Sequence, residues 1–544
     1  MRRRITYIQP QHVSFHPSQT TLTPNSLAIS NLVASREERV TLGFDELTGE
    51  RLLLGRVELS LIYHGGKQIW QVLKQCHQVH VRWARSEQYD AVSPYSSRVS
   101  PGLHVFYSPI PSYGDSAGLD REALCKLLKK VFEPELGCES PEKSFITPPI
   151  LSTRFASTAA YQFYELLPSL KNLVTYIQQK HCEREDEECY RHVELISSAD
   201  SIDINYDSIS HSLTMSGYWS KAPGGADGWT EVIRKHKGAT GQVEVGLLGA
   251  EPANDPEEIK MGGLLAVVGE DTELKPTLFS FPSRHHPLPE DTVYSVSFSP
   301  PTGLHPTMTI SMSREALKEP SGRPDAACAL HAYLTLPSSV FGDKYQLSTS
   351  DELFLKSHNL VSLRAVAGET DLEAPDWFVP RWGSNWLLEL ASPSGSDQSL
   401  KDWNVTIPLH LRYLNPSESG YRSVSVPWPA VFWACTAEDG TKMAMNPFDR
   451  VNLGWEGLFG PKSMFYQLHP SPNSEDALLV EELEVPVLTL KEADGLFQSR
   501  VIELGTVAVL GLGFLWVLWK LGLVARSSGI RSQQRGTDKR AKAE

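Results

Sequence analysis

Apolar and polar residues alternate with a period of two in six separate stretches of the chain. Such alternation predicts β-strands with one buried face, and the Pro and Gly residues between the stretches are turn signals. The stretches are 57–61, 79–83, 202–206, 294–298, 308–312 and 407–413. The sequence therefore predicts a mainly β protein built from antiparallel β-sandwich-like domains, rather than a nucleotide-binding α/β sheet.

Two stretches break this pattern with helical spacing. Leu124, Leu127, Leu128 and Val131 predict a helix with Asp120 as its N-cap. A second helix is expected within 161–180, although Pro168 limits its continuity. Loops rich in Pro and Gly place the main boundary between about 275 and 325. We therefore expect an N-terminal β-rich domain with helical insertions over 1–300 and a second β-sandwich domain over 301–500.

One apolar run, 504–525, is long enough to cross a membrane, and its only charge is Lys520. Its 22 residues reach about 33 Å as a helix, against a hydrocarbon core of ~30 Å. The tail 526–544 has six basic and two acidic residues, a charge of 6 − 2 = +4, whereas acidic residues precede the run. The positive-inside rule then predicts a cytosolic tail and a luminal ectodomain.

The N-terminus leaves the route into the lumen open. Its basic start, Met1 to Arg4, is not followed by an apolar signal-peptide core. Either the late span translocates the ectodomain, or the protein is tail-anchored with a cytosolic ectodomain. Asn404 lies in the single N-glycosylation sequon, which weakly favours the lumen. The tail, which carries Arg540 and Lys542, resembles a dilysine retrieval signal of the endoplasmic reticulum, or is a plain basic tail.

Composition narrows the class of protein further. The chain of 544 residues has a net charge of −14, which argues against a general nucleic-acid binder. Seven cysteines are too few for a disulfide scaffold, although one or two bridges are possible in a lumen. On a continuous helix the Cα atoms of Cys182 and Cys189 would lie about 10 Å apart. They can pair only if the acidic run between them forms a loop.

Motifs that would indicate catalysis or a cofactor are absent from the sequence. It contains no G-x-S-x-G, H-E-x-x-H, Walker A, G-x-G-x-x-G, C-x-x-C or D-x-D pattern. His181, Cys182, Cys189 and His192 have no standard zinc spacing, and a disulfide or free thiols fit them better. His285 and His286 precede Pro287, so we expect a solvated loop there. We predict no catalytic residue, metal or cofactor, but a site assembled from distant residues stays open.

The stretch 424–469 is unusually rich in aromatic residues. It can be a packed β-sandwich core, or an exposed patch that docks a membrane partner. The second interpretation makes six aromatic side chains candidate partner contacts: Trp428, Phe432, Trp433, Phe448, Trp455 and Phe459.

Three segments in the second half carry a pattern of apolar and polar residues: Leu334–Phe341 followed by Asp343, Tyr345 and Leu347, then Asp371–Pro375, then Ile407–Tyr413. Together they resemble the PIG-X family. The extension NPFDRVNLGWEGLFG from Asn446 is similar to the fungal, protease-B-nonderepressible branch of that family. The resemblance covers about 330–435 and extends through the branch to the C-terminal run, whereas it supports 1–300 only loosely.

The resemblance implies a single-pass glycoprotein of the endoplasmic reticulum with a luminal ectodomain. It implies a non-catalytic subunit that stabilises the multi-span catalytic subunit of GPI mannosyltransferase I, which adds the first mannose to the GPI precursor. It also implies a link to the folding of other luminal proteins. A general membrane-tethered luminal chaperone and a membrane-tethered hydrolase remain the alternatives.

Overall fold

The computed structural model describes fifteen stretches of the chain. They are residues 2–10, 13, 15–43, 66–110, 120–148, 161–182, 186–225, 227–235, 242–320, 322, 325–393, 402–437, 454–473, 477–489 and 499–540. The chain divides into two compact units. The first comprises Met1–Leu414 and Ser423–Val485, and the second comprises Asn415–Arg422 and Pro486–Glu544.

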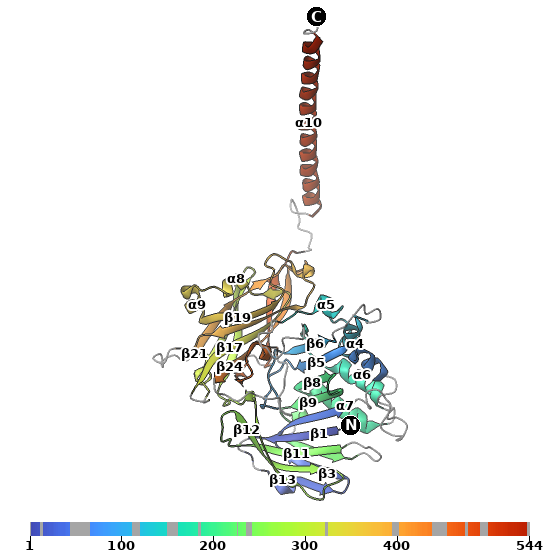
Figure 1. Ribbon diagram of the computed structural model, residues 1–544, viewed down its shortest axis with the longest axis vertical. Helices are drawn as coiled ribbons and strands as arrows, with labels where there is room; N and C mark the ends of the chain where they lie inside the picture. Colours follow the sequence, from blue (N-terminus) through green and yellow to red (C-terminus); the bar gives the residue numbers. More distant parts are fainter. Residues whose placement is uncertain are drawn as a thin grey trace. The chain divides into compact units, whose positions relative to one another are not determined.

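The first unit is mainly β, which confirms the predicted fold class. Its N-terminal half, residues 2–282, contains a ten-stranded sheet (Figure 1). Every neighbouring pair in that sheet is antiparallel except β1 and β11, which run parallel. In sheet order the strands are β13 (Lys275–Pro282), β12 (Glu258–Val267), β11 (Gln242–Glu251), β1 (Arg2–Gln9), β4 (Ser35–Leu42), β9 (Ser212–Trp219), β8 (Ser201–Asp207), β5 (Cys76–Ala84), β6 (Gly102–Pro109) and β7 (Tyr161–Glu165).

A three-stranded sheet and several helices complete the core of this half. Side chains from both sheets and from the helices form one buried cluster, which includes Tyr7, Leu27 and Leu128. The small sheet is β10 (Trp229–Arg234), β3 (Ser26–Leu32) and β2 (Thr20–Thr23). The helices are α3 (Gly66–Leu73), α4 (Ala123–Val131), α5 (Pro141–Ser144), α6 (Lys171–His181) and α7 (Glu187–Glu194), with the 3-10 turns η1 (Pro17–Gln19), η3 (Leu195–Ser198) and η4 (Pro223–Gly225).

The C-terminal half of the first unit, residues 285–414 and 423–485, contains a six-stranded and a four-stranded sheet. The six-stranded sheet is β14 (His285–His286), β25 (Ser463–Gln467), β24 (Ala430–Ala437), β17 (Ala326–Pro337), β20 (Gly383–Leu390) and β19 (Leu360–Gly368). The four-stranded sheet is β21 (Asp402–Pro408), β16 (His305–Ser313), β15 (Val293–Thr302) and β26 (His469–Pro470). Two strand pairs join β18 (Val340–Phe341) to β22 (His410–Leu411) and β23 (Tyr421–Pro427) to β27 (Val480–Pro486). Short helices α8 (Lys344–Leu347) and α9 (Glu352–His358) and the turns η5 (Glu315–Leu317), η6 (Asp376–Phe378) and η7 (Glu456–Leu458) connect them.

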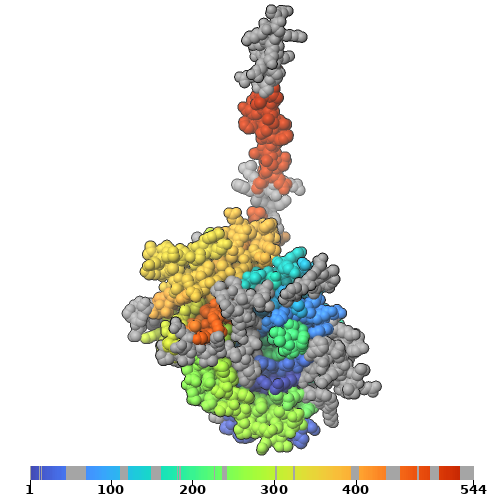
Figure 2. Space-filling view, viewed as in Figure 1, coloured from blue at the N-terminus to red at the C-terminus, as the bar shows by residue number. Residues whose placement is uncertain are grey.

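Buried polar contacts join the two halves into one unit. The amide of Gln467 donates to the carbonyl oxygen of Arg98 at 3.0 Å and accepts from the N–H of Arg98 at 2.6 Å. Gln162 accepts at 2.7 Å from Asn385 and, through its carbonyl oxygen, at 2.9 Å from Trp382. Because buried amides are costly unless they are hydrogen-bonded, these contacts fix how the halves pack. Figure 2 shows their surfaces, blue to green and yellow to orange. The predicted division at residue 300 stays a prediction.

Most predicted elements are confirmed, and three need correction. The alternating stretches at 79–83, 202–206, 294–298 and 308–312 form β5, β8, β15 and β16, whereas 57–61 lies outside the described residues. The stretch 407–413 is not one strand, because β21 ends at Pro408 and β22 pairs with β18 in another sheet. The predicted helix at 161–180 is wrong in its first part, because residues 161–165 form strand β7, whose Phe163 is fully buried. Helix α4 is confirmed, but Glu122 takes its N-cap position; Asp120 instead accepts a hydrogen bond from the Glu122 N–H.

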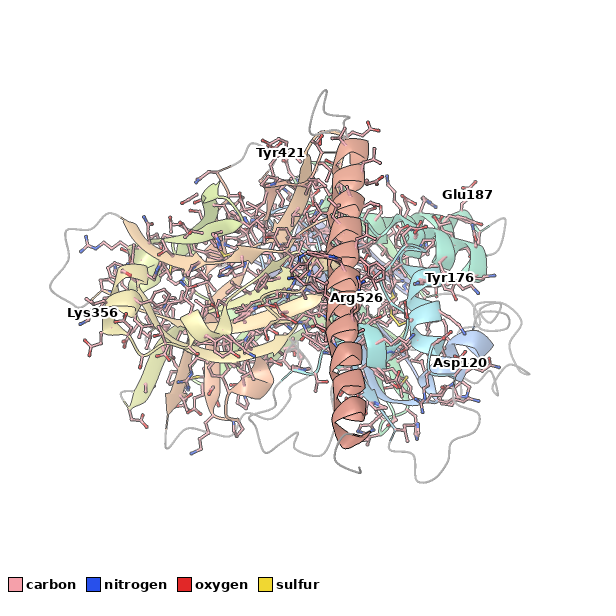
Figure 3. All side chains as sticks on the ribbon, turned by 90° about the horizontal axis from the view of Figure 1, so that it is seen from above. Asp120, Tyr176, Glu187, Lys356, Tyr421 and Arg526 are labelled. Atoms are coloured by element: carbon pink, nitrogen blue, oxygen red, sulfur yellow. A yellow bond between two sulfur atoms is a disulfide. The ribbon has the colours of Figure 1, made fainter. Side chains whose placement is uncertain are left out.

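The second unit carries α10 (Ser499–Arg540), the one helix within the described residues that is long and apolar enough to cross a membrane. Its apolar part, Val501–Arg526, confirms the expected run at 504–525 and supports single-pass membrane anchoring. Arg526, labelled in Figure 3, ends that part. The ammonium group of Lys520 lies near the rings of Trp516 and Trp519, and such a combination of basic and aromatic side chains is expected at a membrane interface.

Candidate partner-docking site

Four of the six candidate aromatic contacts lie in the interior, so for these four the packed core is the alternative that fits. Trp428, Phe432, Trp433 and Trp455 are all buried. Phe432 and Trp433 lie on β24, a central strand between β17 and β25, and Trp455 lies just before η7. Phe432 stacks on Trp455 with 4.9 Å between ring centroids. On the other face, the Trp433 indole donates to the carbonyl oxygen of Ala316 at 2.9 Å.

The other two candidates have different outcomes. Phe448 lies outside the described residues. Phe459 is partly buried and packs edge-on against Phe432 and His331, at 6.0 and 5.0 Å between ring centroids. Burial lowers the pKa of His331 to about 4, so this cluster holds a neutral imidazole. That any of the six residues contacts a partner stays a prediction.

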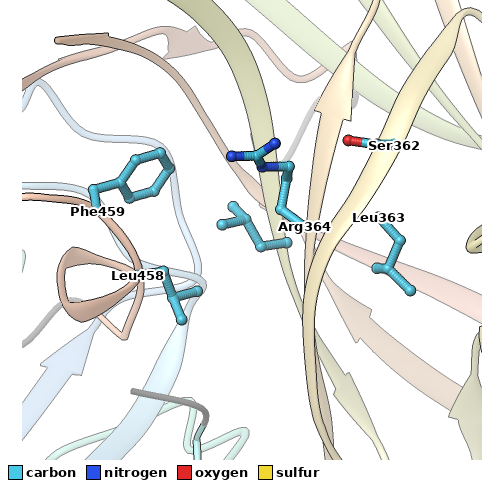
Figure 4. A pocket seen from close by; sticks show the side chains of 6 residues that line it. Ser362, Leu363, Arg364, Leu458 and Phe459 are labelled. Carbon is cyan, nitrogen blue, oxygen red and sulfur yellow. The ribbon is translucent and has the colours of Figure 1, made fainter. Parts of the chain in front are cut away.

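A pocket of about 260 Å³ lies beside Phe459 (Figure 4). Leu458 and Phe459 line one side, and residues of β19 and β20 line the other. The full lining is Ser362, Leu363, Arg364, Leu387, Leu458 and Phe459. This volume lies below the ~300–1,000 Å³ typical of small-molecule sites, and Ser362 and Arg364 are the polar side chains in its wall. The pocket therefore gives little support to the hydrolase alternative.

Three of the four candidate metal residues are used in other contacts. Cys182 and Cys189 form a disulfide, because α6 ends at His181 and α7 begins at Glu187, so the chain between them is not one continuous helix. Tyr176 and Glu187 in Figure 3 mark these two helices. His192 pairs with Glu38 at 3.0 Å. In the described part of the chain, no group of three or more His, Cys, Asp or Glu side chains could hold a metal ion.

The expectation of a solvated loop at His285 and His286 is wrong. Both side chains are buried in strand β14, where they stack on Phe465 and Tyr466 of β25. His285 also contacts Glu456 at 2.7 Å. Burial alone would raise the pKa of Glu456, but the hydrogen bond and charge of His285 hold that pKa below its usual value. This pair fixes the turn η7 against β14.

Asn404, the predicted glycosylation site, is exposed on β21, an edge strand of the four-stranded sheet. Its backbone carbonyl oxygen accepts from the Asn359 amide at 2.8 Å, and the hydroxyl of Thr406 is 2.7 Å from His358. The local backbone is thus fixed while the Asn404 side chain faces solvent. Glycosylation there stays a prediction.

The three segments that carry the PIG-X resemblance meet at a buried arginine. Arg412 follows β22 and is 2% exposed. Its guanidinium donates to the carbonyl oxygens of Ser338 at 2.9 Å and Ala374 at 2.8 Å, and also to that of Asp371. The same group lies 4.1 Å from the ring centroid of Phe341. Arginine suits this position because its planar fork of donors can serve several carbonyl groups at once.

These contacts hold a loop that presents aromatic side chains to solvent. We call residues 369–378 together with Tyr413 the Arg412-held loop. The Ser338 hydroxyl donates to Asp376 at 2.6 Å, and the Asp376 N–H donates to the carbonyl oxygen of Tyr413 at 3.0 Å. Trp377, Phe378 and Tyr413 are 58%, 75% and 67% exposed. Asp371–Pro375 and Tyr413 lie within the segments that resemble the PIG-X family. Residue type alone, however, does not distinguish the exposed aromatic side chains of this loop from the buried ones elsewhere.

The residues that the structure describes form a membrane-anchored protein in which a large β-sheet unit is followed by one candidate membrane span. Comparison with known proteins then gives the family. The PIG-X / PBN1 family model matches residues 301–522, which include the Arg412-held loop and the span. The chain is 72% identical over 548 residues to Protein pbn1 of Emericella nidulans and 59% identical over 548 residues to that of Aspergillus fumigatus, with full coverage of each chain. It is 38% identical to Protein pbn1 of Neurospora crassa, over 98% of this chain and 97% of that one. The chain therefore belongs to the PIG-X / PBN1 family, and this membership supports an accessory role in GPI-anchor biosynthesis.

Proposed function

We propose that the chain is a non-catalytic subunit that stabilises the multi-span catalytic subunit of GPI mannosyltransferase I in the endoplasmic reticulum membrane. Family membership over the full length of the chain is the observation that carries the proposal. The architecture supports it, because the described residues contain a single candidate span that follows a β-sheet unit, which suits a companion of a membrane enzyme. A lipid-linked mannose donor is handled within the membrane, and the companion contributes contacts rather than chemistry.

We also propose that the ectodomain is luminal. Three disulfides support this placement, because disulfides persist in oxidising compartments and are rare in the cytosol. They join Cys125 to Cys138, Cys182 to Cys189 and Cys328 to Cys435. The seventh cysteine, Cys76, is a buried thiol whose pKa burial raises to about 12, so it is a poor partner for exchange.

The test of the stabilising role is depletion of the chain followed by quantification of the catalytic subunit. We expect the steady-state level of that subunit to fall and first-mannose transfer to fall with it. Re-expression of the full chain should restore both. A normal level of the catalytic subunit, together with normal first-mannose transfer, would refute the proposal.

Topology has its own test at Asn404. We expect the full chain from membranes to shift in mobility on glycosidase treatment, and Asn404→Gln to abolish the shift. The matched control is Asn415→Gln, because Asn415 is followed by proline and is not an acceptor. A chain from membranes that shows neither a glycan nor a disulfide would place the ectodomain in the cytosol.

The general chaperone alternative loses the surface on which it depended. It required aromatic residues of 424–469 to bind immature clients, but Trp428, Phe432, Trp433 and Trp455 are buried. These four side chains therefore offer no surface to a client.

A further inference from the structure

Solvent-exposed aromatic side chains concentrate in the Arg412-held loop. Trp377 and Phe378 are adjacent on η6, and Tyr413 is tied to them through the bond from the Asp376 N–H to its carbonyl oxygen. Leu372, in the same loop, is 43% exposed. Large apolar side chains that are exposed together mark an interaction surface more often than scattered ones do, and Trp and Tyr dominate the energetics of protein interfaces.

The loop is fixed before any partner binds. Arg412 anchors it from below through the carbonyl oxygens of Asp371 and Ala374, and Ser338 anchors it through the Asp376 carboxylate. A loop that is already ordered loses little conformational entropy on binding, so exposed aromatics on it contribute more of their contact energy to affinity. The buried guanidinium therefore acts through the loop as a positioning group.

Charge distinguishes a protein partner from the lipid surface. Residues 369–381 carry four acids, Glu369, Asp371, Glu373 and Asp376, and one base, Arg381, a charge of −4 + 1 = −3. Asp371 and Glu373 are exposed on either side of Leu372. Carboxylates enter a bilayer at a high cost, so the exposed acids disfavour insertion of the loop into lipid. The surface fits instead a protein recess that combines apolar walls with basic side chains at its rim.

The length of the chain between the first unit and the candidate membrane span limits where a partner protein can lie. The first unit ends at Val485, and the apolar part of α10 begins at Val501, 16 residues later. Fully extended, this connection spans at most about 55 Å. The ectodomain consequently stays near the bilayer, and the luminal face of a membrane protein is within its reach.

We propose that the Arg412-held loop docks into an apolar, base-rimmed recess on the luminal face of the multi-span catalytic subunit. The partner's identity rests on the proposed function; the surface and its chemistry rest on the exposed aromatics and acids.

The experiment compares co-purification of the catalytic subunit from detergent-solubilised membranes with full-length variants. We expect Trp377→Ser with Phe378→Ser to reduce recovery about tenfold or more, because two aromatic anchors are removed from one interface. The matched control is Tyr345→Ser with Leu353→Ser, two residues that are 69% and 79% exposed outside the loop, and it should retain wild-type recovery. Retention of the Cys328–Cys435 bond in each variant shows that the ectodomain has folded.

A second variant tests the charge. Glu373→Lys should lower recovery at low salt, and the deficit should become smaller at high salt, where both chains lose the electrostatic term. No deficit relative to the wild-type chain, or a deficit of the same size at both salt concentrations, would overturn the base-rimmed recess.

A photo-reactive residue at position 378 of the full chain identifies the occupant directly. An adduct with the catalytic subunit is expected. An adduct with lipid or with a second copy of this chain would overturn the proposal. Wild-type recovery of the Trp377/Phe378 variant, while depletion of the whole chain still lowers the catalytic subunit, would refute the surface and leave the proposed function standing. A catalytic subunit unaffected by depletion would refute the proposed function itself.

Discussion

The disulfide between Cys328 and Cys435 crosslinks the C-terminal half of the first unit, and such a bond is expected in an oxidising compartment. Cys328 on β17 lies directly opposite Cys435 on β24 in the six-stranded sheet. The bond closes a stretch of 107 residues, which contains β18–β22 and the entire Arg412-held loop. The perturbation is Cys328→Ala with Cys435→Ala, or reduction of the native bond.

The expected loss of stability follows from the length of the closed chain. In the chain-entropy model, a loop of this length restricts the unfolded state by about 4.7 kcal/mol. The bond between Cys182 and Cys189 has a sequence separation of only 7, and the same relation gives about 2.4 kcal/mol. We therefore expect the Cys328/Cys435 variant to lose about twice as much free energy of unfolding as a Cys182→Ala with Cys189→Ala control.

Tryptophan fluorescence during urea unfolding of the full chain in detergent measures this difference. Trp386 and Trp433 are both buried in the six-stranded sheet and report on its loss. Equal losses in the two variants would refute the loop-length argument. Free thiols at Cys328 and Cys435 in chain taken from membranes without reductant would refute the pairing and, with it, the oxidising compartment.

Three further perturbations test the ectodomain. Gly383→Ala should lower the free energy of unfolding by more than about 2 kcal/mol, because the φ of Gly383 is +150° and an added Cβ atom would lie 2.0 Å from a carbonyl oxygen of β17. The control Gly457→Ala, which has open space around the added Cβ atom, should cost little. His331 has a folded-state pKa of about 4, against ~6.5 in the unfolded chain, so the stability that its neutral form contributes above pH 6.5 is lost as the pH falls toward 4. The loss is about 2 kcal/mol at pH 5, and His331→Phe should remove that part of the pH dependence of urea unfolding. Arg412→Lys should lower the free energy of unfolding by about 3 kcal/mol and speed tryptic cleavage after Arg381, because one ammonium group cannot bind all the carbonyl oxygens that the guanidinium binds. An unchanged cleavage rate would contradict the anchoring role of Arg412.

Periodicity predicted those strands whose two faces differ. β16 alternates buried Met308, Ile310 and Met312 with less buried residues, so its sequence indicates its structure. β4 does not, because residues 35–38, Ser-Arg-Glu-Glu, are all buried in a central strand. Arg36 lies between the rings of Trp219 and Trp229, at 5.0 and 5.1 Å, and pairs with Glu38 at 2.7 Å. A charged run is usually a solvated face, and only the tertiary partners make its burial possible.

The exposed aromatic residues of the Arg412-held loop could not be predicted from the sequence for the same reason, because the exposure of a side chain depends on its tertiary neighbours. Trp433 and Trp377 are the same residue type in aromatic surroundings, yet one is buried in a central strand and the other is exposed on a turn. Local density of aromatics measures how much apolar surface a segment has, not which neighbours cover it. The burial of Trp433 depends on β17 and β25, which are about 100 and 30 residues away in the sequence.

Arg412 shows how a resemblance confined to short segments can specify a surface. The segments that carry it supply the guanidinium, the carbonyl oxygens of Ser338, Asp371 and Ala374, and the ring of Phe341. None of those groups needs to touch a partner. Together they fix the backbone from which the exposed aromatics project, so a change at Arg412 should weaken partner binding through disorder of the loop rather than through a lost contact. In the proposed docking, the segments that resemble the family support the loop, and the exposed side chains of Trp377, Phe378 and Tyr413 make the contacts.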